Sequence, residues 1–201
     1  MRLGRWNATG AHAVYSSMLD DFTKAGTADS DTHPRRAHDA VVWRAYVARD
    51  DAAPLASLFR DAILRLTPPH YDAAQRAAWA AVADDLDAFN ARLARGVTLV
   101  AEHAGEPVAF GQLFPCDHVE MLYVAPGWTR RGLASALIAR FEALAREAWA
   151  STLDTDASAL ARPVFERAGF SLVAQEVVRR GSVSLPRFHL CKPLGAASFS
   201  G

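Results

Sequence analysis

The stretch from Val124 to Leu137, VAPGWTRRGLASAL, decides the fold because it joins two regular elements through one short turn. The run before it, from Asp117 to Val124, is typical of an extended, largely apolar strand. After it, apolar residues recur every three or four positions, which predicts a helix with one apolar face formed by Leu133, Leu137, Phe141, Leu144 and Ala148. The sequence therefore predicts a strand that runs directly into the first turn of a helix.

The start of this helix is a candidate anion site. A helix that begins at the end of a strand leaves several backbone N–H groups unpaired, beside the positive end of the helix dipole. Such a point binds anions. Gly132 lets the backbone approach a ligand without a Cβ in the way, while Ala134 and Ser135 keep the first turn slim. Arg130 and Arg131 add positive charge, so the turn suits a pyrophosphate.

The common phosphate motifs are absent from this turn, which contains neither G-x-x-x-x-G-K-[ST] nor G-x-G-x-x-G. Nucleotide hydrolysis is therefore disfavoured. A purely structural interpretation is the alternative, in which Thr129 caps the helix and the two arginines lie in solvent. The turn alone does not decide between the two.

The chain divides near residue 40. Residues 1–40 are rich in Thr, Ser, Asp, His and Gly without periodicity, so we expect a flexible extension, with a short helix near residues 12–22 as an option. Residues 41–194 carry the patterns of a single domain, and residues 195–201 form a tail. A length of 201 residues with 51% hydrophobic composition suits one ordinary core.

The domain is predicted to contain a strand, two helices, three strands, a helix, a strand, a helix and two strands. The first strand begins at Val41, and the helix after Asp50 carries Leu55, Leu58, Phe59 and Leu66. The second helix carries Trp79, Val82, Leu86, Phe89 and Leu93 and is closed by Gly96. A hairpin with a Gly-Glu-Pro turn follows, and later elements are the strand STLDT, a helix over Ser158–Ala168, and the strands FSLVAQEVV and LPRFHLCK. We expect an α/β (α+β) fold with a mixed, mostly antiparallel sheet and helices on both faces.

Charge and composition narrow the partners. Lys plus Arg and Asp plus Glu both number 22, so no basic field favours nucleic acid or an anionic membrane. Two cysteines, no metal-binding spacing and no membrane-length apolar run predict a cytoplasmic protein without a metal. The sequence GLASA around Ser135 is not the G-x-S-x-G elbow of hydrolases.

Three segments resemble the GNAT superfamily of acyl-CoA-dependent N-acetyltransferases: His118–Pro126, Arg130–Ala134 and Ser158–Phe170. The family's turn reads Gln/Arg-x-x-Gly-x-Gly/Ala. Gly132 and Ala134 match it, whereas Thr129 stands where Gln or Arg is usual. Because the family grips the coenzyme A pyrophosphate mostly through main-chain amides, we expect this departure to weaken the signature more than the binding. The resemblance says little about the acceptor.

The resemblance implies a sheet that splays between its fourth and fifth strands, which would free backbone groups of Leu122, Tyr123 and Val124 to pair with pantetheine and polarise the thioester. The implied coenzyme site comprises these three residues and Thr129, Arg130, Arg131, Gly132, Leu133, Ala134, Ser135, Ser158 and Phe165. The implied reaction is direct attack on acetyl-CoA by a primary amine of a small molecule or peptide. A homodimer stays open.

His118 and Glu120 are the candidate bases that must remove the amine's proton. They are expected to share one face of their strand, with Tyr123 pointing the opposite way, because strand side chains alternate. His118 falls where some GNAT enzymes place a carboxylate base, and a near-neutral pKa suits the task. Glu120 is the alternative, directly or through water. Structural roles for both, as a hydrogen-bonded histidine and an arginine partner, stay open.

The general acid is missing from its usual place. Many GNAT members carry a tyrosine where this chain has Phe165, so either another group protonates the sulfur or the thiolate leaves unaided. Ser158 replaces a common asparagine and is expected to cap a helix. Phe165 packs either along pantetheine or in the core. With Thr129, these departures leave open a non-catalytic acyl-CoA sensor, or an interaction domain that binds no coenzyme.

Overall fold

A computed structural model describes residues 40–195. Apart from Ala40 and Gly195, the predicted extension, its optional helix and the C-terminal tail lie outside the described residues.

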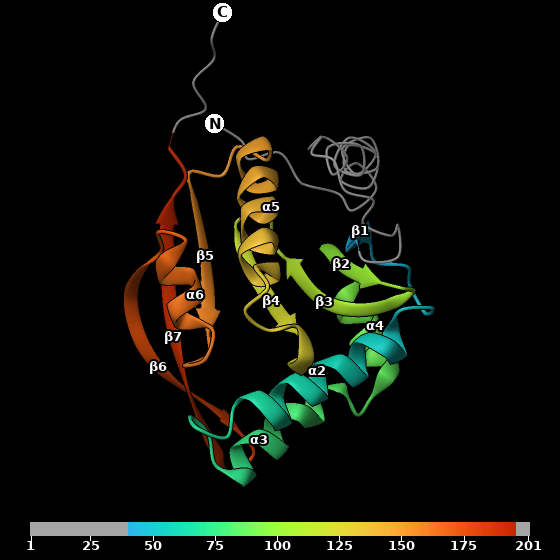
Figure 1. The fold of residues 1–201 in the computed structure, drawn as a ribbon. Coiled ribbons are helices and arrows are strands. Elements are labelled where there is room, and N and C mark those ends of the chain that lie inside the picture. The colour runs from blue at the N-terminus through green and yellow to red at the C-terminus, as the bar shows by residue number, and fades with distance from the viewer. Residues whose placement is uncertain (1–39, 196–201) are drawn as a thin grey trace, which may run out of the picture.

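Seven strands form one sheet in the order β1-β2-β3-β4-β5-β7-β6 (Figure 1). Their bounds are β1 Val42–Ala45, β2 Val97–His103, β3 Glu106–Leu113, β4 His118–Val124, β5 Thr152–Ala157, β6 Ser171–Arg180 and β7 Val183–Pro193. Every neighbouring pair is antiparallel except β4 and β5, which run parallel. The predicted mixed, mostly antiparallel sheet is confirmed.

Helices cover both faces of this sheet, as predicted. Within residues 40–195 they are α2 Ala52–Leu66, α3 Ala73–Ala80, α4 Leu86–Leu93, α5 Leu133–Glu147 and α6 Arg162–Arg167, with 3-10 turns at Ala81–Ala83 and Pro126–Trp128. No helix in this part of the chain is both long and apolar enough to cross a membrane.

The core consists of two hydrophobic clusters, one on each face of the sheet. The α5 cluster includes Leu137 and Phe141, and the α2 cluster includes Phe59 and Ile63. All four are at most 2% exposed, and fully burying a side chain of this size contributes roughly 2 kcal/mol. The clusters have no buried residue in common. The apolar stripes of α2 and α5 therefore dock these helices on opposite faces.

Strands β4 and β5 touch only at their start. His118 pairs with Asp154 and Val119 with Thr155, and the strands then diverge (Figure 1). At the point of divergence, the Thr155 hydroxyl donates a hydrogen bond of 2.8 Å to the Val119 carbonyl. From Glu120 to Val124, the edge of β4 that faces β5 is unpaired. The predicted splay between the fourth and fifth strands is confirmed.

A β-bulge in β4 changes which side chains share a face. Gln112 pairs with Met121 but the next residue of β3, Leu113, pairs with Val119, so Glu120 is the extra residue. Tyr123 belongs to the α2 cluster. In β5, Leu153 and Ala157 belong to the α5 cluster, so Asp154 and its partner His118 lie on the α2 side. The expectation that Tyr123 points opposite His118 assumed strict alternation and is wrong.

The predicted second helix is interrupted. It breaks into α3, a 3-10 turn and α4, because the Asp85 carboxylate accepts the N–H of Ala88 at 2.9 Å and starts a new helix. Gly96 does not close it, since α4 ends at Leu93. A Cβ at Gly96 would lie 2.3 Å from the Leu113 carbonyl oxygen, so glycine allows the close approach of β3.

Two other boundaries differ from expectation. The turn between β2 and β3 is formed by Ala104 and Gly105, with φ of 51° and 85°, rather than by Gly-Glu-Pro. Helix α6 begins at Arg162 instead of Ser158, because the residues between them form a separate hydrogen-bonded turn.

Candidate functional site

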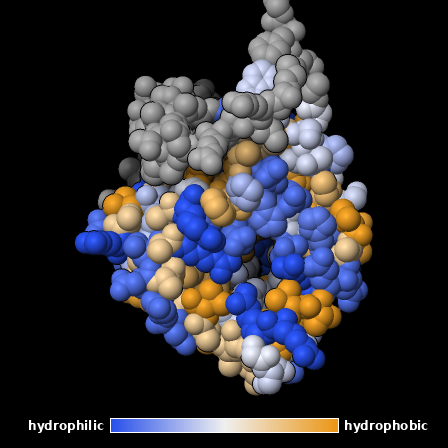
Figure 2. All heavy atoms as spheres, turned by 180° about the vertical axis from the view of Figure 1, so that it is seen from behind, coloured by the Kyte–Doolittle hydropathy of each residue, from blue (hydrophilic) through white to orange (hydrophobic). Residues whose placement is uncertain are grey.

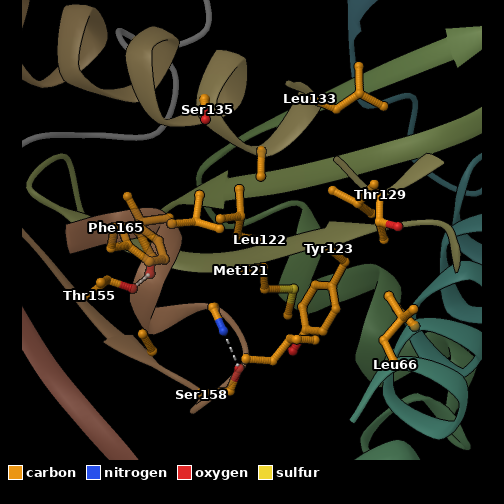
Figure 3. A pocket seen from close by; sticks show the side chains of 18 of the residues that line it. Leu66, Met121, Leu122, Tyr123, Thr129, Leu133, Ser135, Thr155, Ser158 and Phe165 are labelled. Atoms are coloured by element: carbon orange, nitrogen blue, oxygen red, sulfur yellow. Dashed lines mark hydrogen bonds between the residues drawn. The ribbon is translucent and has the colours of Figure 1, made fainter. Parts of the chain in front are cut away.

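A cleft of about 480 Å³ lies where β4 and β5 diverge (Figure 3). Its walls come from β4, the first turn of α5, α2, and the segment from Thr155 to Arg167. Apart from Arg131, all the predicted coenzyme-site residues line it: Leu122, Tyr123, Val124, Thr129, Arg130, Gly132, Leu133, Ala134, Ser135, Ser158 and Phe165. Of the two candidate bases, Glu120 lines the cleft and His118 does not.

Helix α5 begins without a side-chain cap. Its N-cap is Gly132, with a left-handed φ of 83°, and the first N–H to bond within the turn is that of Ala136, which donates to the Gly132 carbonyl at 2.9 Å. The N–H groups of Leu133, Ala134 and Ser135 precede that bond and so have no partner within the helix. All three residues line the cleft.

The polar residues before α5 do not cap it. The Thr129 hydroxyl donates instead to the Pro126 carbonyl at 3.3 Å, so the structural interpretation of Thr129 as the helix cap is wrong. Arg130 is exposed and lines the cleft. The Arg131 guanidinium lies over the Trp128 ring, 4.4 Å from its centre. One arginine therefore contributes charge to the cleft wall, while the other stacks beside it.

The middle of β4 forms the long wall of the cleft (Figure 3). Leu122 and Val124 pack against the α5 cluster. Tyr123 packs on the other face, 4.6 Å from the Phe59 ring, and its hydroxyl accepts a 3.3 Å hydrogen bond from the Trp79 indole N–H. Burial raises the pKa of Tyr123 to about 12, so it stays a neutral phenol at physiological pH.

Ser158 and Phe165 form the wall opposite. The Ser158 hydroxyl accepts the N–H of Ala161 at 3.1 Å within the turn before α6, whose N-cap is Ala161 without a side-chain cap, so the expectation that Ser158 caps a helix is wrong. Phe165 is 1% exposed and packs edge-on against Phe170 with ring centres 5.1 Å apart. It belongs to the α5 cluster and also lines the cleft. Packing in the core and packing along pantetheine, the two roles left open for Phe165, are therefore not exclusive.

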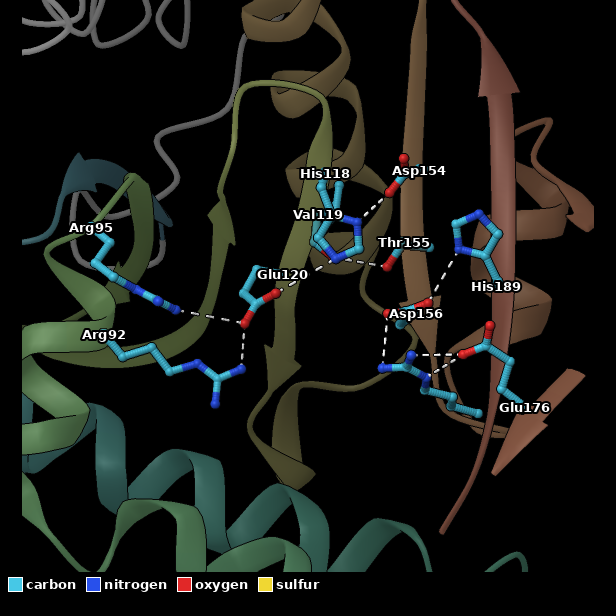
Figure 4. Close-up of polar contacts among 11 residues, drawn as sticks. Arg92, Arg95, His118, Val119, Glu120, Asp154, Thr155, Asp156, Glu176 and His189 are labelled. Carbon is cyan, nitrogen blue, oxygen red and sulfur yellow. Dashed lines mark hydrogen bonds and ion pairs between the residues drawn. The ribbon is translucent and has the colours of Figure 1, made fainter. Parts of the chain in front are cut away.

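Glu120 lies at the bulge, between two strands and a helix end (Figure 4). Its carboxylate pairs with the guanidinium of Arg92 from α4, and that of Arg95 lies 4.0 Å away. Gln112 holds the end of α4 by donating to the Arg92 carbonyl at 2.8 Å and the Leu93 carbonyl at 3.0 Å. Glu120 therefore has the arginine partner that was left open as its structural role. Gln112 of β3 holds the end of the helix that carries this arginine.

His118 lies between two carboxylates. Its Nδ1 is hydrogen-bonded to Asp154 Oδ1, and its Nε2 lies 3.5 Å from Glu120 Oε2 (Figure 4). Burial disfavours the imidazolium, but the hydrogen bond and charge of Asp154, with the charges of Asp156 and Glu120, outweigh it and raise the pKa of His118 above 6.5. His118 and Glu120 lie on the same side of the sheet, as predicted, although the bulge at Glu120 interrupts the alternation on which that prediction rested.

Asp154 and Arg92 were missed by the sequence analysis. The two aspartates of Leu153–Ala157 alternate with uncharged residues, a period-two signal that places Asp154 and Asp156 on one face of a strand. The side of the sheet opposite α5 and α6 shows hydrophilic residues around a central hollow (Figure 2).

Among residues 40–195, no three His, Cys, Asp or Glu side chains are grouped as a metal ion requires.

Comparisons with known proteins agree with this geometry. Residues 67–186 match the model of the acetyltransferase (GNAT) domain family. The chain is 34% identical over 141 residues to the uncharacterized N-acetyltransferase YafP of Escherichia coli (strain K12). The aligned region covers 70% of this chain and 88% of that protein.

Solved structures show the same likeness. A GCN5-related N-acetyltransferase from Rhodopseudomonas palustris is 34% identical with a TM-score of 0.74, over 79% of this chain and 99% of that one. The PaiA N-acetyltransferase from Thermoplasma acidophilum, solved in complex with coenzyme A, has a TM-score of 0.64 at 13% identity, over 77% and 99% of the two chains.

Proposed function

This chain belongs to the GNAT family of acetyltransferases, and on that premise we propose that it transfers an acetyl group from acetyl-CoA to a primary amine within a ternary complex. One observation carries the proposal. The uncapped start of α5 and the unpaired edge of β4 line the same cleft.

The start of α5 fits a pyrophosphate. The N–H groups of Leu133, Ala134 and Ser135 are hydrogen-bond donors at the positive end of a 15-residue helix, and Arg130 adds charge. A Cβ at Gly132 would meet no protein atom within 4 Å, so the backbone there is open to a ligand. The coenzyme A complex of PaiA, which has the same fold, supports this choice of ligand.

The unpaired edge of β4 fits the rest of the coenzyme. Between Glu120 and Val124 it offers backbone donors and acceptors that suit the amide groups of pantetheine. Acetyl-CoA supplies an acetyl group that is activated as a thioester. A backbone N–H of Leu122–Val124, directed at the oxyanion that forms during attack, stabilises the transition state by about 3 kcal/mol.

The amine must lose a proton before it attacks, because an alkylammonium has a pKa of about 10. Glu120 is the candidate that reaches the cleft, and His118 lies 3.5 Å behind it. We therefore assign Glu120 the first contact with the ammonium and give His118 a share in the role of base. Phe165 cannot donate a proton, so a thiolate with a pKa of about 8.5 leaves unaided.

Calorimetry with acetyl-CoA and thiol release across a panel of amines test this function. We expect micromolar binding and turnover with at least one amine. Tight binding without turnover on any amine would favour an acyl-CoA sensor, and absence of binding would favour an interaction domain.

A substitution separates the base from the coenzyme site. His118→Ala should lower kcat while the Kd of acetyl-CoA stays unchanged, because His118 does not line the cleft. Equal loss of turnover and affinity would contradict the role of His118 as a base.

A further inference from the structure

We propose that Asp154 is a positioning residue for acetyl transfer: it holds the His118 ring with Nε2 toward Glu120, so that His118 receives the proton that Glu120 takes from the amine. This inference rests on the proposed function. It assigns a role to a residue of β5, across the splay from the strand that carries both candidate bases.

The geometry links three side chains in sequence (Figure 4). Asp154 is the cross-strand neighbour of His118 at one of the two residue pairs that join β4 and β5. Its carboxylate bonds Nδ1, which fixes the ring and leaves Nε2 facing Glu120 Oε2 at 3.5 Å. Glu120, the extra residue of the β-bulge, is the member of the three that lines the cleft.

The charges around these three side chains favour transfer of the proton from Glu120 to His118. His118 faces the carboxylates of Asp154 and Asp156 on β5 and of Glu120 on β4, which together stabilise the imidazolium. Glu120 also pairs with Arg92, and the guanidinium of Arg95 lies 4.0 Å from its carboxylate. A carboxylate at the cleft wall with a basic imidazole behind it is suited to accept a proton and pass it on.

The protons and electrons balance as follows. The ammonium gives one proton to the Glu120 carboxylate, and Glu120 gives it to Nε2 of neutral His118 while Asp154 retains the hydrogen bond from Nδ1–H. The neutral amine forms a C–N bond to the acetyl carbonyl, and the C–S bond breaks with its electron pair on sulfur. The second amine proton passes to the thiolate, and the imidazolium later releases its proton to water.

A second histidine–aspartate pair provides a matched control. His189 on β7 lies 3.2 Å from Asp156, on the same strand as Asp154. Asp156 is also bound by Arg187 at 3.0 Å, and His189 does not line the cleft. His189→Gln therefore removes a histidine from the same type of contact and leaves the side chains of Asp154, His118 and Glu120 unchanged.

An NMR titration of the His118 ring in the coenzyme-free protein tests the electrostatic link, with the signal assigned by its loss in His118→Gln. We expect a midpoint above 6.5 in the wild type, the same midpoint in His189→Gln, and one about 1 pH unit lower in Asp154→Asn. An unchanged midpoint in Asp154→Asn would overturn the proposal. Asp154→Ser serves the same purpose if the asparagine variant does not fold, and circular dichroism checks both.

The pH dependence of kcat/KM tests the functional link. Since the relay needs neutral His118, activity rises with pH through its pKa. In Asp154→Asn we expect this rise to move about 1 pH unit lower and the plateau to fall about tenfold, with the Kd of acetyl-CoA unchanged. Asp154→Glu, which keeps the charge, should restore the wild-type midpoint.

The outcomes separate the two proposals. Wild-type turnover together with an unmoved pH profile in Asp154→Asn would overturn the relay and leave acetyl transfer intact. A wild type that acetylates no amine, despite a shifted NMR midpoint, would overturn the proposed function and with it the relay. A lower plateau without a moved midpoint would reduce Asp154 to a structural link between strands.

Discussion

Helices α3 and α4 begin with aspartates, whereas α5 begins with a glycine. The Asp72 carboxylate accepts the N–H of Gln75 at 2.8 Å, and that of Asp85 accepts the N–H of Ala88 at 2.9 Å. Gly132 offers no such acceptor to α5. Since a side-chain cap is worth about 1 kcal/mol, the longest of these three helices omits a stabilisation that the two short ones use. The difference leaves the first N–H groups of α5 without a side-chain acceptor, which is the feature on which the proposed pyrophosphate site depends.

The start of α2 is a third case. Its N-cap, Asp51, makes no cap bond because its carboxylate is held by the Arg44 guanidinium at 2.7 and 2.8 Å and by the N–H of Val47 at 2.7 Å. The same residue type thus caps two helices and forms a buried ion pair at another. Substitutions at the starts of α2, α4 and α5 test this division of roles.

The largest effect is expected at α2. Arg44→Ala should lower the free energy of unfolding by about 3 kcal/mol, because Asp51 is 5% exposed and would be left charged without its partner. Urea unfolding measures this loss. The Kd of acetyl-CoA should not change, since neither residue lines the cleft.

The pH dependence of this loss has a definite sign. Burial opposes ionisation of Asp51, but Arg44 outweighs it and lowers the pKa below 3.8, so the pair stabilises the fold above that pH and the stabilisation fades as the pH falls through the lowered value. In Arg44→Ala only the hydrogen bond from the Val47 N–H still opposes burial, so the pKa of Asp51 is higher than in the wild type. The gap between the proteins should therefore shrink below about pH 4. An equal gap at pH 3 and pH 7 would contradict the ion pair.

The next effect is expected at α5. Gly132→Ala places a Cβ at a φ of 83°, which costs roughly 1–2 kcal/mol, and we expect the strained turn to shift its amides and raise the Kd of acetyl-CoA about tenfold. Gly105→Ala is the matched control, because its φ is 85°, its surroundings are equally open, and it does not line the cleft. Both variants should lose similar stability, but only the first should lose affinity. Equal affinities in calorimetry would contradict the pyrophosphate site.

A smaller effect is expected at α4. Asp85→Ala should lower the free energy of unfolding by about 1 kcal/mol, because the N–H of Ala88 loses its acceptor. Asp85→Asn should retain most of the stability, since asparagine caps as well as aspartate. Urea unfolding compares the two. If the variants were equally unstable, the carboxylate would act through its charge rather than as a cap.

The smallest effect is expected from the charge beside α5. Arg130→Ala should raise the Kd of acetyl-CoA about threefold at low salt, because Arg130 is exposed and lines the cleft. The difference should vanish near 1 M salt, where the screening length falls to about 3 Å. Arg131→Ala is the control, because Arg131 does not itself line the cleft and its guanidinium is stacked on the Trp128 ring. Identical salt profiles for the two variants would remove the distinction between these arginines.

The features that the sequence predicted are local ones. The apolar stripes of α2 and α5 follow from spacing within each helix, and the start of α5 just after β4 follows from the order strand, turn and glycine. The splay between β4 and β5 was implied by family resemblance rather than by any pattern within either strand.

The features that the sequence did not predict depend on pairing between distant segments. The bulge at Glu120 exists only in the register of β4 against β3, and the contact of His118 with Asp154 needs two strands 36 positions apart in the chain. Gly96 is explained by the approach of Leu113, which no local pattern encodes. Asp85 is an exception, because an aspartate before an apolar run is a local signal for a helix start. The apolar spacing on both sides of Asp85 instead favours one continuous helix.

The absence of shared members between the two hydrophobic clusters has a consequence for how such a fold diversifies. The α2 cluster and the adjoining cleft wall draw on the helical segment between Ala52 and Leu93, whereas the first turn of α5 rests on the α5 cluster. A lineage can therefore accumulate changes in one stretch of its gene and reshape one wall of the cleft, while the start of α5 and the packing beneath it are inherited unchanged in another.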